Sequence, residues 1–314
     1  MPRTLIVVCG PTATGKTKLG VALAKRFHGE VVSADSMQVY REMRIGTARP
    51  TEAEMEGVPH HMMAVADPWE SYSVARYVEE ATACVEDILR RGKQPILVGG
   101  TGQYIDALKK GQTFSAFRPE SGERERLQAI AAAGGLPDLR RELERIDPEA
   151  AARIHPNDEK RTIRALEVFY ETGETISAHD RRTKALPPRY EAVTIALTYE
   201  NRADLYARID RRVDRMMEAG LAQEVRALLD RGIPPDCTAM QAIGYKEMVQ
   251  AVQNGGDLAA AAEEVKLRSR QYAKRQLTWF RRERDAHWIF LARNPDFSSV
   301  GQISTDFIHG HGLG

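Results

Sequence analysis

The chain has 314 residues, 42% of them hydrophobic, so it can bury a sizeable core in one large domain or two modest ones. Its 45 Lys and Arg residues nearly balance 44 Asp and Glu residues, and the formal net charge of +1 excludes a general attraction to polyanions; any nucleic-acid-binding surface must be local. Three widely spaced cysteines match neither a disulfide framework nor a zinc site, and no apolar run reaches the ~18 residues of a membrane span, so we expect a cytoplasmic protein without membrane contact.

Short apolar runs typical of β-strands occupy residues 5–9, 31–34, 62–66 and 95–98, separated by segments long enough for crossover helices. One such segment, residues 74–89, repeats apolar residues at helical spacing and ends at Gly92. This alternation predicts an α/β fold, with a parallel sheet flanked by helices.

Residues 113–190 differ from the rest of the chain, because helical patterns punctuated by Gly and Pro follow one another without a strand run. We interpret them as an all-helical insertion domain between the first part of the core, residues 1–112, and its second part, residues 191–314. Strands are predicted again at 192–198 and 287–291, with helices between them. The Gly- and Ser-rich tail from Asn294 is expected to fray.

Residues 10–17, GPTATGKT, follow the first predicted strand with the spacing G-x-x-x-x-G-K-T of a phosphate-binding loop. At such a turn the helix N-terminus presents N–H groups to phosphate oxygens. The lysine would reach the outer phosphate, and the last threonine would bind Mg²⁺ as a metal ligand. The residues predicted to bind a terminal diphosphate group are Gly10, Pro11, Thr12, Ala13, Thr14, Gly15, Lys16 and Thr17.

Asp35 ends the strand-like run VVSAD that follows the loop and its helix. In small-metabolite kinases an aspartate at such a place can act as the base for an acceptor hydroxyl, whereas the sequence ADS is also common turn chemistry. The run PILVGG ends in glycines instead of the aspartate that would anchor Mg²⁺ in an ATPase. Local reasoning leaves a kinase open, with Asp35 as either a base or a turn residue.

Several long segments resemble, in chain order, the motifs of bacterial tRNA dimethylallyltransferases, the tRNA isopentenyltransferase family. After GPTATGKT they read VVSADSMQVYREMRIGTARP, PILVGGTGQYIDAL, RIHPNDEKRTIRALEVF, MQAIGYKE and RQYAKRQLTWFR, and they extend from Gly10 to Arg281. The resemblance implies a P-loop kinase-like fold whose loop holds dimethylallyl diphosphate with Mg²⁺.

The resemblance also implies a reaction: transfer of a dimethylallyl group to N6 of the adenosine 3′ of the anticodon, position 37, in tRNAs that read codons starting with U. Asp35 matches the family's catalytic base, which N6 requires because its lone pair is delocalised into the ring. Thr101 matches a catalytic hydroxyl near the diphosphate, with a plain turn role as its alternative. Arg212, or Arg208 one helical turn earlier, matches a catalytic arginine on the diphosphate; a solvated helix face with Asp210 and Asp214 as partners is the alternative.

An adenine N6 inside a stacked loop is out of reach, so the base must be flipped into a pocket. The resemblance implies that the insertion clasps the anticodon stem-loop and that Gln38 reads the flipped base. For Tyr245 it implies contact with tRNA, and a position in the protein core is the alternative. The residues that match the family's tRNA contacts are Asp35, Ser36, Met37, Gln38, Lys160, Arg161, Thr162, Ile163, Arg164, Gln241, Gly244, Tyr245 and Lys246.

A further segment, residues 266–284, interleaves many basic residues with Tyr272, Trp279 and Phe280. Phosphate contacts combined with stacking surfaces are typical of single-stranded RNA recognition, whereas a long surface helix with an apolar stripe is the alternative. His60 and His61 are interpreted as structural, because adjacent strand residues point to opposite faces and no Cys or carboxylate cluster completes a metal site. We expect a monomer. The rival interpretations are a P-loop small-metabolite or nucleotide kinase, which would have no use for the RNA segments, and an RNA-binding protein without chemistry, which would leave Asp35 and Thr101 without a role.

Overall fold

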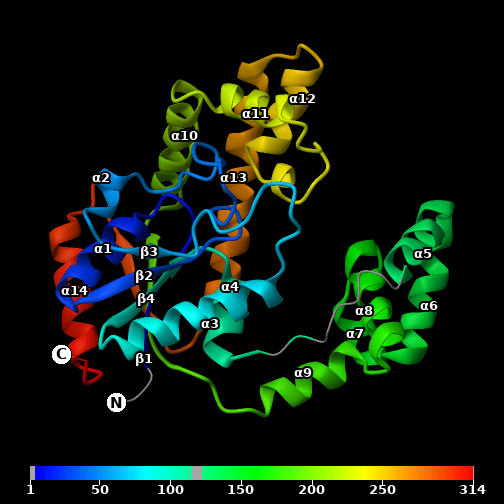
Figure 1. Cartoon of the computed structure of the whole chain (residues 1–314), viewed down its shortest axis with the longest axis horizontal. Helices are drawn as coiled ribbons and strands as arrows, with labels where there is room; N and C mark the ends of the chain where they lie inside the picture. Colours follow the sequence, from blue (N-terminus) through cyan, green and yellow to red (C-terminus); the bar gives the residue numbers. More distant parts are fainter. Residues whose placement is uncertain (1–3, 113, 115–121, 314) are drawn as a thin grey trace. The chain divides into compact units, whose positions relative to one another are not determined.

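The computed structural model describes residues 4–112, 114 and 122–313. These residues form one sheet of six parallel strands in the order β3-β2-β4-β1-β5-β6 (Figure 1), which confirms the predicted α/β class. The strands are β1 (Thr4–Cys9), β2 (Gly29–Ala34), β3 (His60–His61), β4 (Gln94–Gly99), β5 (Glu191–Tyr199) and β6 (His287–Leu291).

The middle of the sheet explains the continuous apolar runs of the sequence. Val8 of β1 lies between Val98 of β4 and Ile195 of β5, and all three side chains are buried. Strands that are covered on both faces have no need for polar residues at alternate positions. Because β1, β2 and β4 are parallel neighbours, their carboxyl ends meet at one edge of the sheet, which is where ligands bind in such folds.

The third strand is shorter than predicted and begins earlier. The prediction placed it at 62–66, whereas β3 contains only His60 and His61. Met62 and Ala64 have positive φ angles of 63° and 54°, a left-handed conformation that interrupts a strand. Beyond them, Ala66 makes a single isolated bridge.

The helices that accompany the sheet include the predicted amphipathic helix between β3 and β4, which buries Tyr77, Val78, Ala81, Val85 and Ile88. No described helix combines the length and the apolar character that a membrane span requires. The helical elements are α1 (Lys16–Arg26), α2 (Glu52–Met55), α3 (Val74–Arg90), α4 (Gly102–Lys110), α10 (Arg202–Glu218), α11 (Leu221–Asp230), the 3₁₀ turn η3 (Ala239–Gln241), α12 (Tyr245–Gln253), α13 (Leu258–Phe280) and α14 (Phe297–His309).

The C-terminal segment is a helix, so the expectation that it frays is wrong. Asp296 caps α14 by accepting hydrogen bonds from the backbone N–H groups of Ser298 and Ser299. Val300 and Ile308 are buried in the same apolar cluster as the inner face of α1, beside which α14 lies in Figure 1. Packing against α1 therefore stabilises a segment whose Gly and Ser content alone disfavours a helix.

The chain divides into two compact units, Met1–Gly111 with Arg189–Gly314, and Gln112–Pro188. The second unit has an apolar cluster of its own, in which Leu127, Leu143 and Leu166 are buried. Its described residues form helices only: α5 (Glu123–Ile130), the π-helical turn η2 (Ala131–Gly135), α6 (Leu136–Ile146), α7 (Pro148–Arg153), α8 (Glu159–Thr172) and α9 (Ile176–Lys184).

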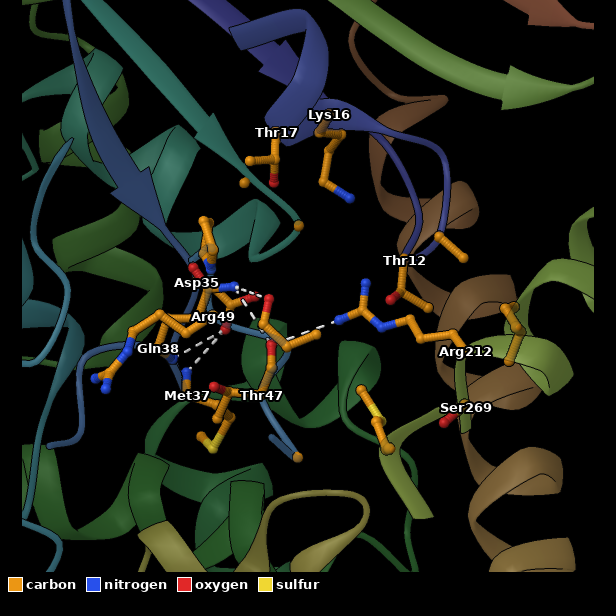
Figure 2. Close-up of a pocket in the computed structure, with 18 of the residues that line it drawn as sticks. Thr12, Lys16, Thr17, Asp35, Met37, Gln38, Thr47, Arg49, Arg212 and Ser269 are labelled. Atoms are coloured by element: carbon orange, nitrogen blue, oxygen red, sulfur yellow. Dashed lines mark hydrogen bonds between the residues drawn. The ribbon is translucent and has the colours of Figure 1, made fainter. Parts of the chain in front are cut away.

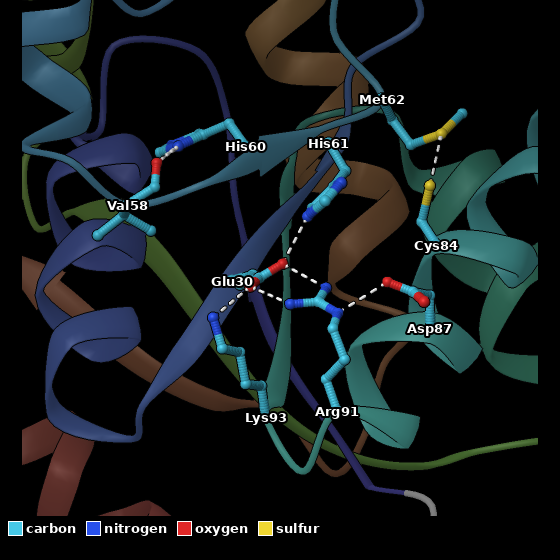
Figure 3. Close-up of polar contacts among 9 residues, drawn as sticks. All are labelled: Glu30, Val58, His60, His61, Met62, Cys84, Asp87, Arg91 and Lys93. Carbon is cyan, nitrogen blue, oxygen red and sulfur yellow. Dashed lines mark hydrogen bonds and ion pairs between the residues drawn. The ribbon is translucent and has the colours of Figure 1, made fainter.

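A buried carboxylate ties together the amino end of β2, β3 and the turn after α3 (Figure 3). Glu30 is 2% exposed and accepts hydrogen bonds from both Nη atoms of Arg91, at 2.5 and 2.7 Å, and from Lys93 Nζ at 2.7 Å. His61 Nε2 lies 2.7 Å from the same carboxylate, while His60 bonds to a backbone carbonyl. The hydrogen bonds from Arg91, then those from Lys93 and His61, hold the pKa of Glu30 well below its usual range.

Replacing Glu30 with glutamine is expected to lower the free energy of unfolding by about 2–3 kcal/mol at pH 7, because Lys93 loses its counter-ion and Arg91 keeps only Asp87. A carboxyl whose pKa is lowered on folding contributes stability above its unfolded-state pKa, and this contribution is lost as the pH falls. The difference between the wild type and Glu30→Gln should therefore shrink below about pH 4.5. Urea unfolding at pH 7 and pH 4, with the exposed Glu52→Gln as control, checks this. A difference that is the same at both pH values would contradict the assignment.

Candidate active site

The predicted phosphate-binding loop connects β1 to α1 at the carboxyl edge of the sheet. Gly15 is the N-cap of α1 with φ 81°, a left-handed conformation that favours glycine, and a Cβ there would come within 2.2 Å of the Phe297 ring. No described side chain caps α1, so the backbone N–H groups of its first turn are available to a ligand. The loop therefore offers hydrogen-bond donors and the positive end of a helix dipole to an anion.

Five of the eight loop residues line one pocket: Thr12, Ala13, Gly15, Lys16 and Thr17. The others support the loop from behind, since the Thr14 hydroxyl donates to the Pro11 carbonyl at 2.9 Å. Lys16 Nζ donates to the same carbonyl at 2.7 Å. Burial, and second the charge of Arg212, lower the pKa of Lys16 to about 8. An anionic ligand would reverse this unfavourable environment for the ammonium group.

Thr17 suits a Mg²⁺ ion that is held mostly by its substrate. The side chain points into the pocket (Figure 2), and its hydroxyl makes no side-chain hydrogen bond within the described part of the chain. Among the described residues, no group of three or more His, Cys, Asp or Glu side chains could hold a metal alone. Mg²⁺ commonly takes one or two protein oxygens together with phosphate oxygens and waters, so a single hydroxyl beside a phosphate site fits this ion.

Asp35 follows β2 directly and forms a tight turn. Its Oδ1 accepts hydrogen bonds from the backbone N–H groups of Met37 at 2.9 Å and Gln38 at 3.3 Å. Thr101, which follows β4, holds this turn, because its hydroxyl accepts from the Ser36 N–H at 3.0 Å and lies 3.3 Å from Ser36 Oγ. Thr101 itself does not line the pocket, but its side chain also forms a hydrogen bond with Tyr272, which does. Asp35, Ser36, Met37 and Gln38 all line the pocket.

The pocket has a volume of about 1140 Å³ and a strongly positive wall. Against two carboxylates, those of Asp35 and Glu54, the described wall carries eight cationic side chains: Lys16, Lys18, Arg44, Arg49, Arg208, Arg212, Arg215 and Arg275. A cleft lined by one sign of charge raises the local concentration of ligands of the opposite sign. The chain is nearly neutral as a whole, but this pocket attracts anions.

Helix α10 contributes both candidate arginines. Arg208 and Arg212 line the pocket, and burial lowers the pKa of Arg212. The alternative interpretation gave them Asp210 and Asp214 as partners on the same helix. These two aspartates instead pair with basic side chains of α13, at 2.7 and 2.6 Å. Arg212 points into the pocket in Figure 2 and is thus available to an anion.

The side-chain amide of Gln38 is largely engaged. Its Nε2 donates to the carbonyls of Thr47 at 3.3 Å and Ala48 at 3.4 Å, and its Oε1 accepts from the Ser33 hydroxyl at 3.3 Å. A carbonyl oxygen has two lone pairs, so Oε1 keeps one further acceptor position.

Gln276 of α13 is a site residue that the sequence analysis did not identify. It is 6% exposed, its Oε1 accepts from the Thr12 N–H at 3.0 Å, and its Nε2 donates to the Gly100 carbonyl at 2.9 Å. One side chain therefore fixes the phosphate-binding loop to the loop after β4. Tyr272, one turn earlier on α13, lines the same pocket; burial foremost raises its pKa to about 12.

Replacing Gln276 with leucine is expected to lower the free energy of unfolding by about 1–2 kcal/mol, because the Thr12 N–H and the Gly100 carbonyl lose their partner. Gln276→Glu keeps the acceptor for Thr12 but buries a carboxylate whose second oxygen faces the Gly100 carbonyl, so its loss of stability should be at least as large. Urea unfolding of both variants, with exposed Gln271→Leu as control, tests this. If Gln276→Leu unfolds like the control, the amide does not hold the two loops.

The insertion segment that was predicted to contact RNA is only partly at the surface. Thr162 and Ile163 are buried at 0% and 5% exposure, so their side chains belong to the core of the helical unit and are unavailable to RNA. Lys160 and Arg161 are exposed, and Arg164 pairs at 2.6 Å with a buried glutamate. Three basic side chains therefore remain as candidate phosphate contacts.

The segment 241–246 is likewise divided between surface and core. Gln241 and Lys246 are exposed, and Gln241 lines the pocket. Gly244 is buried, and its N–H donates to Glu247 at 2.8 Å. Tyr245 is fully buried, so its side chain packs in the core, which was the alternative interpretation.

The basic and aromatic segment of α13 is also partly internal. Phe280 is buried, Trp279 Nε1 donates to Asp106 at 3.0 Å, and Tyr272 belongs to the pocket wall. Exposed stacking surfaces were expected here, but these aromatic side chains mainly pack within the first unit. The basic side chains of the segment are exposed at Lys274, Arg275, Arg281, Arg282 and Arg284.

Comparisons with known proteins agree over nearly the whole chain. Residues 38–283 match the model of a family described as IPP transferase, and residues 3–65 match one described as isopentenyl transferase. A tRNA dimethylallyltransferase of Halalkalibacterium halodurans is 47% identical over 310 residues, 99% of this chain and 98% of the relative. One of Caldanaerobacter subterraneus is 46% identical over 307 residues, 98% of each chain.

Two solved structures resemble this one. A full-length tRNA isopentenylpyrophosphate transferase from Bacillus halodurans has a TM-score of 0.74 at 45% identity, over 98% of this chain and 96% of that one. A eukaryotic dimethylallyltransferase acting on tRNA has a TM-score of 0.78 at 32% identity, over 98% of this chain and 80% of that one. The fold and the sequence thus point to the same group of proteins.

Proposed function

The chain belongs to the IPP transferase family and is a transferase that modifies tRNA, and from this premise we propose the reaction of its pocket. A dimethylallyl group passes from dimethylallyl diphosphate to N6 of the adenosine 3′ of the anticodon, position 37, in tRNAs that read codons starting with U. The observation that carries this proposal is one positive pocket in which Asp35 shares the space with Lys16 and Arg212 (Figure 2). Such a pocket offers a base to the acceptor and cations to the leaving group.

The acceptor half of the reaction depends on Asp35. As the C1–N6 bond forms, N6 loses a proton, and a free carboxylate oxygen of Asp35 accepts it. The turn supports this role, because both backbone hydrogen bonds go to Oδ1 and leave Oδ2 without a partner among the described residues. Thr101 supports the turn through Ser36, and its contact with the diphosphate, which the resemblance implies, stays a prediction.

The leaving-group half depends on the phosphate-binding loop and Arg212. The C1–O bond breaks and its electron pair stays on the diphosphate, where negative charge grows. Lys16, Arg212 and the free N–H groups of α1 are already positioned to stabilise that charge, so little reorganisation is needed during the reaction. Mg²⁺ held by Thr17 would neutralise part of the diphosphate charge.

The tRNA is held by polar and basic side chains of the insertion and of the segment 241–246. Lys160, Arg161 and Arg164 of the insertion contact phosphates of the anticodon stem-loop, and Gln241 and Lys246 contact the RNA near the pocket mouth. Gln38 accepts a hydrogen bond from the flipped adenine through the remaining lone pair of Oε1.

The deciding experiment incubates the purified protein and Mg²⁺ with unmodified tRNA, together with dimethylallyl diphosphate in one sample and ATP in another. Nucleoside mass analysis should find a five-carbon addition to adenosine only in the first sample. If the second sample consumes ATP and the first shows no five-carbon addition, the proposal is overturned in favour of a kinase. Sequencing the modified tRNA locates the adenosine and tests the assignment to position 37.

A further inference from the structure

The loop of residues 44–49, between β2 and α2, is held by a single carboxylate from α11. Glu224 Oε2 accepts from the Arg44 N–H at 2.9 Å and from the Ile45 N–H at 2.9 Å. Its Oε1 accepts from the Ile45 N–H at 3.1 Å and from the Gly46 N–H at 3.2 Å. Three consecutive backbone N–H groups thus converge on one charged group, the arrangement in which backbones bind anions. Hydrogen bonds to a charged acceptor are stronger than neutral ones, so this end of the loop is firmly fixed.

Tyr245 of α12 keeps Glu224 in place. Its hydroxyl donates to Glu224 Oε1 at 2.6 Å. Its ring lies so close to Gly46 that a Cβ on that residue would come within 2.4 Å of it. Burial foremost, and the charge of Glu224, raise the pKa of Tyr245 far above its usual value, so the phenol stays neutral and donates. The loop, Glu224 and Tyr245 therefore form one interlocked contact.

The other end of the same loop contacts the pocket residues. The Thr47 carbonyl accepts from Arg212 Nη2 at 3.4 Å and from Gln38 Nε2 at 3.3 Å (Figure 2). The Ala48 carbonyl accepts from Gln38 at 3.4 Å. Within the described part of the chain Arg212 has no other hydrogen-bond or ion-pair partner, so the Thr47 carbonyl orients its guanidinium.

We propose that Glu224 is a positioning residue, which orients Arg212 and Gln38 by fixing the loop whose Thr47 carbonyl holds them both. This inference rests on the proposed function, because it assigns the loop to the prenyl-transfer pocket. Glu224 itself is absent from the described pocket wall and acts only through the 44–49 loop. In Glu224→Gln, one neutral carbonyl oxygen replaces two charged oxygens and an NH₂ donor faces the remaining N–H groups, so the loop shifts and Arg212 no longer meets the diphosphate in its productive position.

The first test compares Glu224→Gln with Asp230→Asn, which removes a carboxylate from the exposed end of the same helix. Glu224→Gln should lower kcat/KM for dimethylallyl diphosphate by about 10- to 100-fold, as expected when the support of a site residue is lost. Asp230→Asn should match the wild type. If Glu224→Gln is folded at the assay temperature and has wild-type kcat and KM, the proposal is overturned. A wild type that transfers no prenyl group would instead overturn the proposed function.

The second test separates positioning from a general loss of stability. In protein that already carries Arg212→Lys, Glu224→Gln should lower kcat/KM by a several-fold smaller factor, because the guanidinium that the loop orients is already absent. If the loss of kcat/KM in the double variant equals the product of the two single losses, the link through Arg212 is overturned. If Glu224→Gln fails to fold, Tyr245→Phe replaces it, since it removes one hydroxyl and keeps the ring and the carboxylate. The proposal is supported if Tyr245→Phe lowers kcat/KM several-fold in the wild-type background and by a smaller factor in the Arg212→Lys background. Wild-type kinetics of Tyr245→Phe would overturn it.

Discussion

Replacing Asp35 with asparagine is expected to slow prenyl transfer by about 10²- to 10⁴-fold, the usual contribution of a general base. Asparagine can still accept the N–H groups of Met37 and Gln38 through its Oδ1, so the turn should keep its shape. It no longer accepts the proton from N6 of the adenosine. Binding of tRNA should be roughly unchanged. Turnover at saturating substrate and a titration of labelled tRNA measure the two effects separately.

The control is again Asp230→Asn, which changes the charge equally at an exposed position. Turnover of Asp35→Asn close to that of the wild type would mean that another group, or the diphosphate itself, takes the proton. Loss of tRNA binding together with turnover would mean that Asp35 serves mainly to shape the turn. Thr101→Val would then be informative, because it breaks the contact with Ser36 and leaves the carboxylate present.

The parts of the site that could be predicted from the sequence are those with local causes. The spacing from Gly10 to Thr17, directly after an apolar run, predicts a turn and a helix start behind a strand, and the structure has β1, the turn and α1 in that order. Asp35 follows β2 directly, so the parallel sheet brings it to the same edge as the loop after β1. Five of the six strands lie within two residues of their predicted bounds, because buried parallel strands are apolar throughout.

The parts that were missed have distant causes. Gln276 contacts Thr12 across 264 positions of the chain, and Glu224 contacts Gly46 across 178. Glu224 lies outside the family motifs, and Gln276 lies inside RQYAKRQLTWFR, but no local pattern indicates which distant backbone groups either side chain contacts. The same holds for α14, which forms because it packs on α1, and for the short β3, which ends where Met62 turns left-handed. Such features depend on tertiary contacts that override local preference.

Tyr245 illustrates a third case, in which a resemblance identifies a residue and leaves its role open. The motif MQAIGYKE suggested RNA contact for Tyr245, with a core position as the alternative. The buried ring and the 2.6 Å hydrogen bond to Glu224 favour the core position. A residue can therefore belong to a functional motif by supporting a loop, without touching a substrate.

Replacing Lys16 with alanine is expected to reduce kcat/KM for dimethylallyl diphosphate by about 10²- to 10³-fold, the usual cost of removing one preorganised donor from developing charge. The alkaline side of the pH profile offers a sharper measurement. Burial lowers the pKa of Lys16 to about 8, so the free enzyme loses this positive charge as the pH rises through 8. Because kcat/KM reports the free enzyme, it should fall above about pH 8 in the wild type.

Lys16→Arg is the matched variant, because a guanidinium stays protonated throughout this range. Its kcat/KM should be lower at neutral pH, since the larger group fits the loop less well, but it should not fall as the pH rises through 8. Bound diphosphate favours the charged form of Lys16, so kcat of the wild type should hold to higher pH than kcat/KM. A decline near pH 8 that persists in Lys16→Arg would mean that another group titrates there. Unfolding temperatures of all three proteins, measured in parallel, distinguish loss of the phosphate contact from loss of the loop.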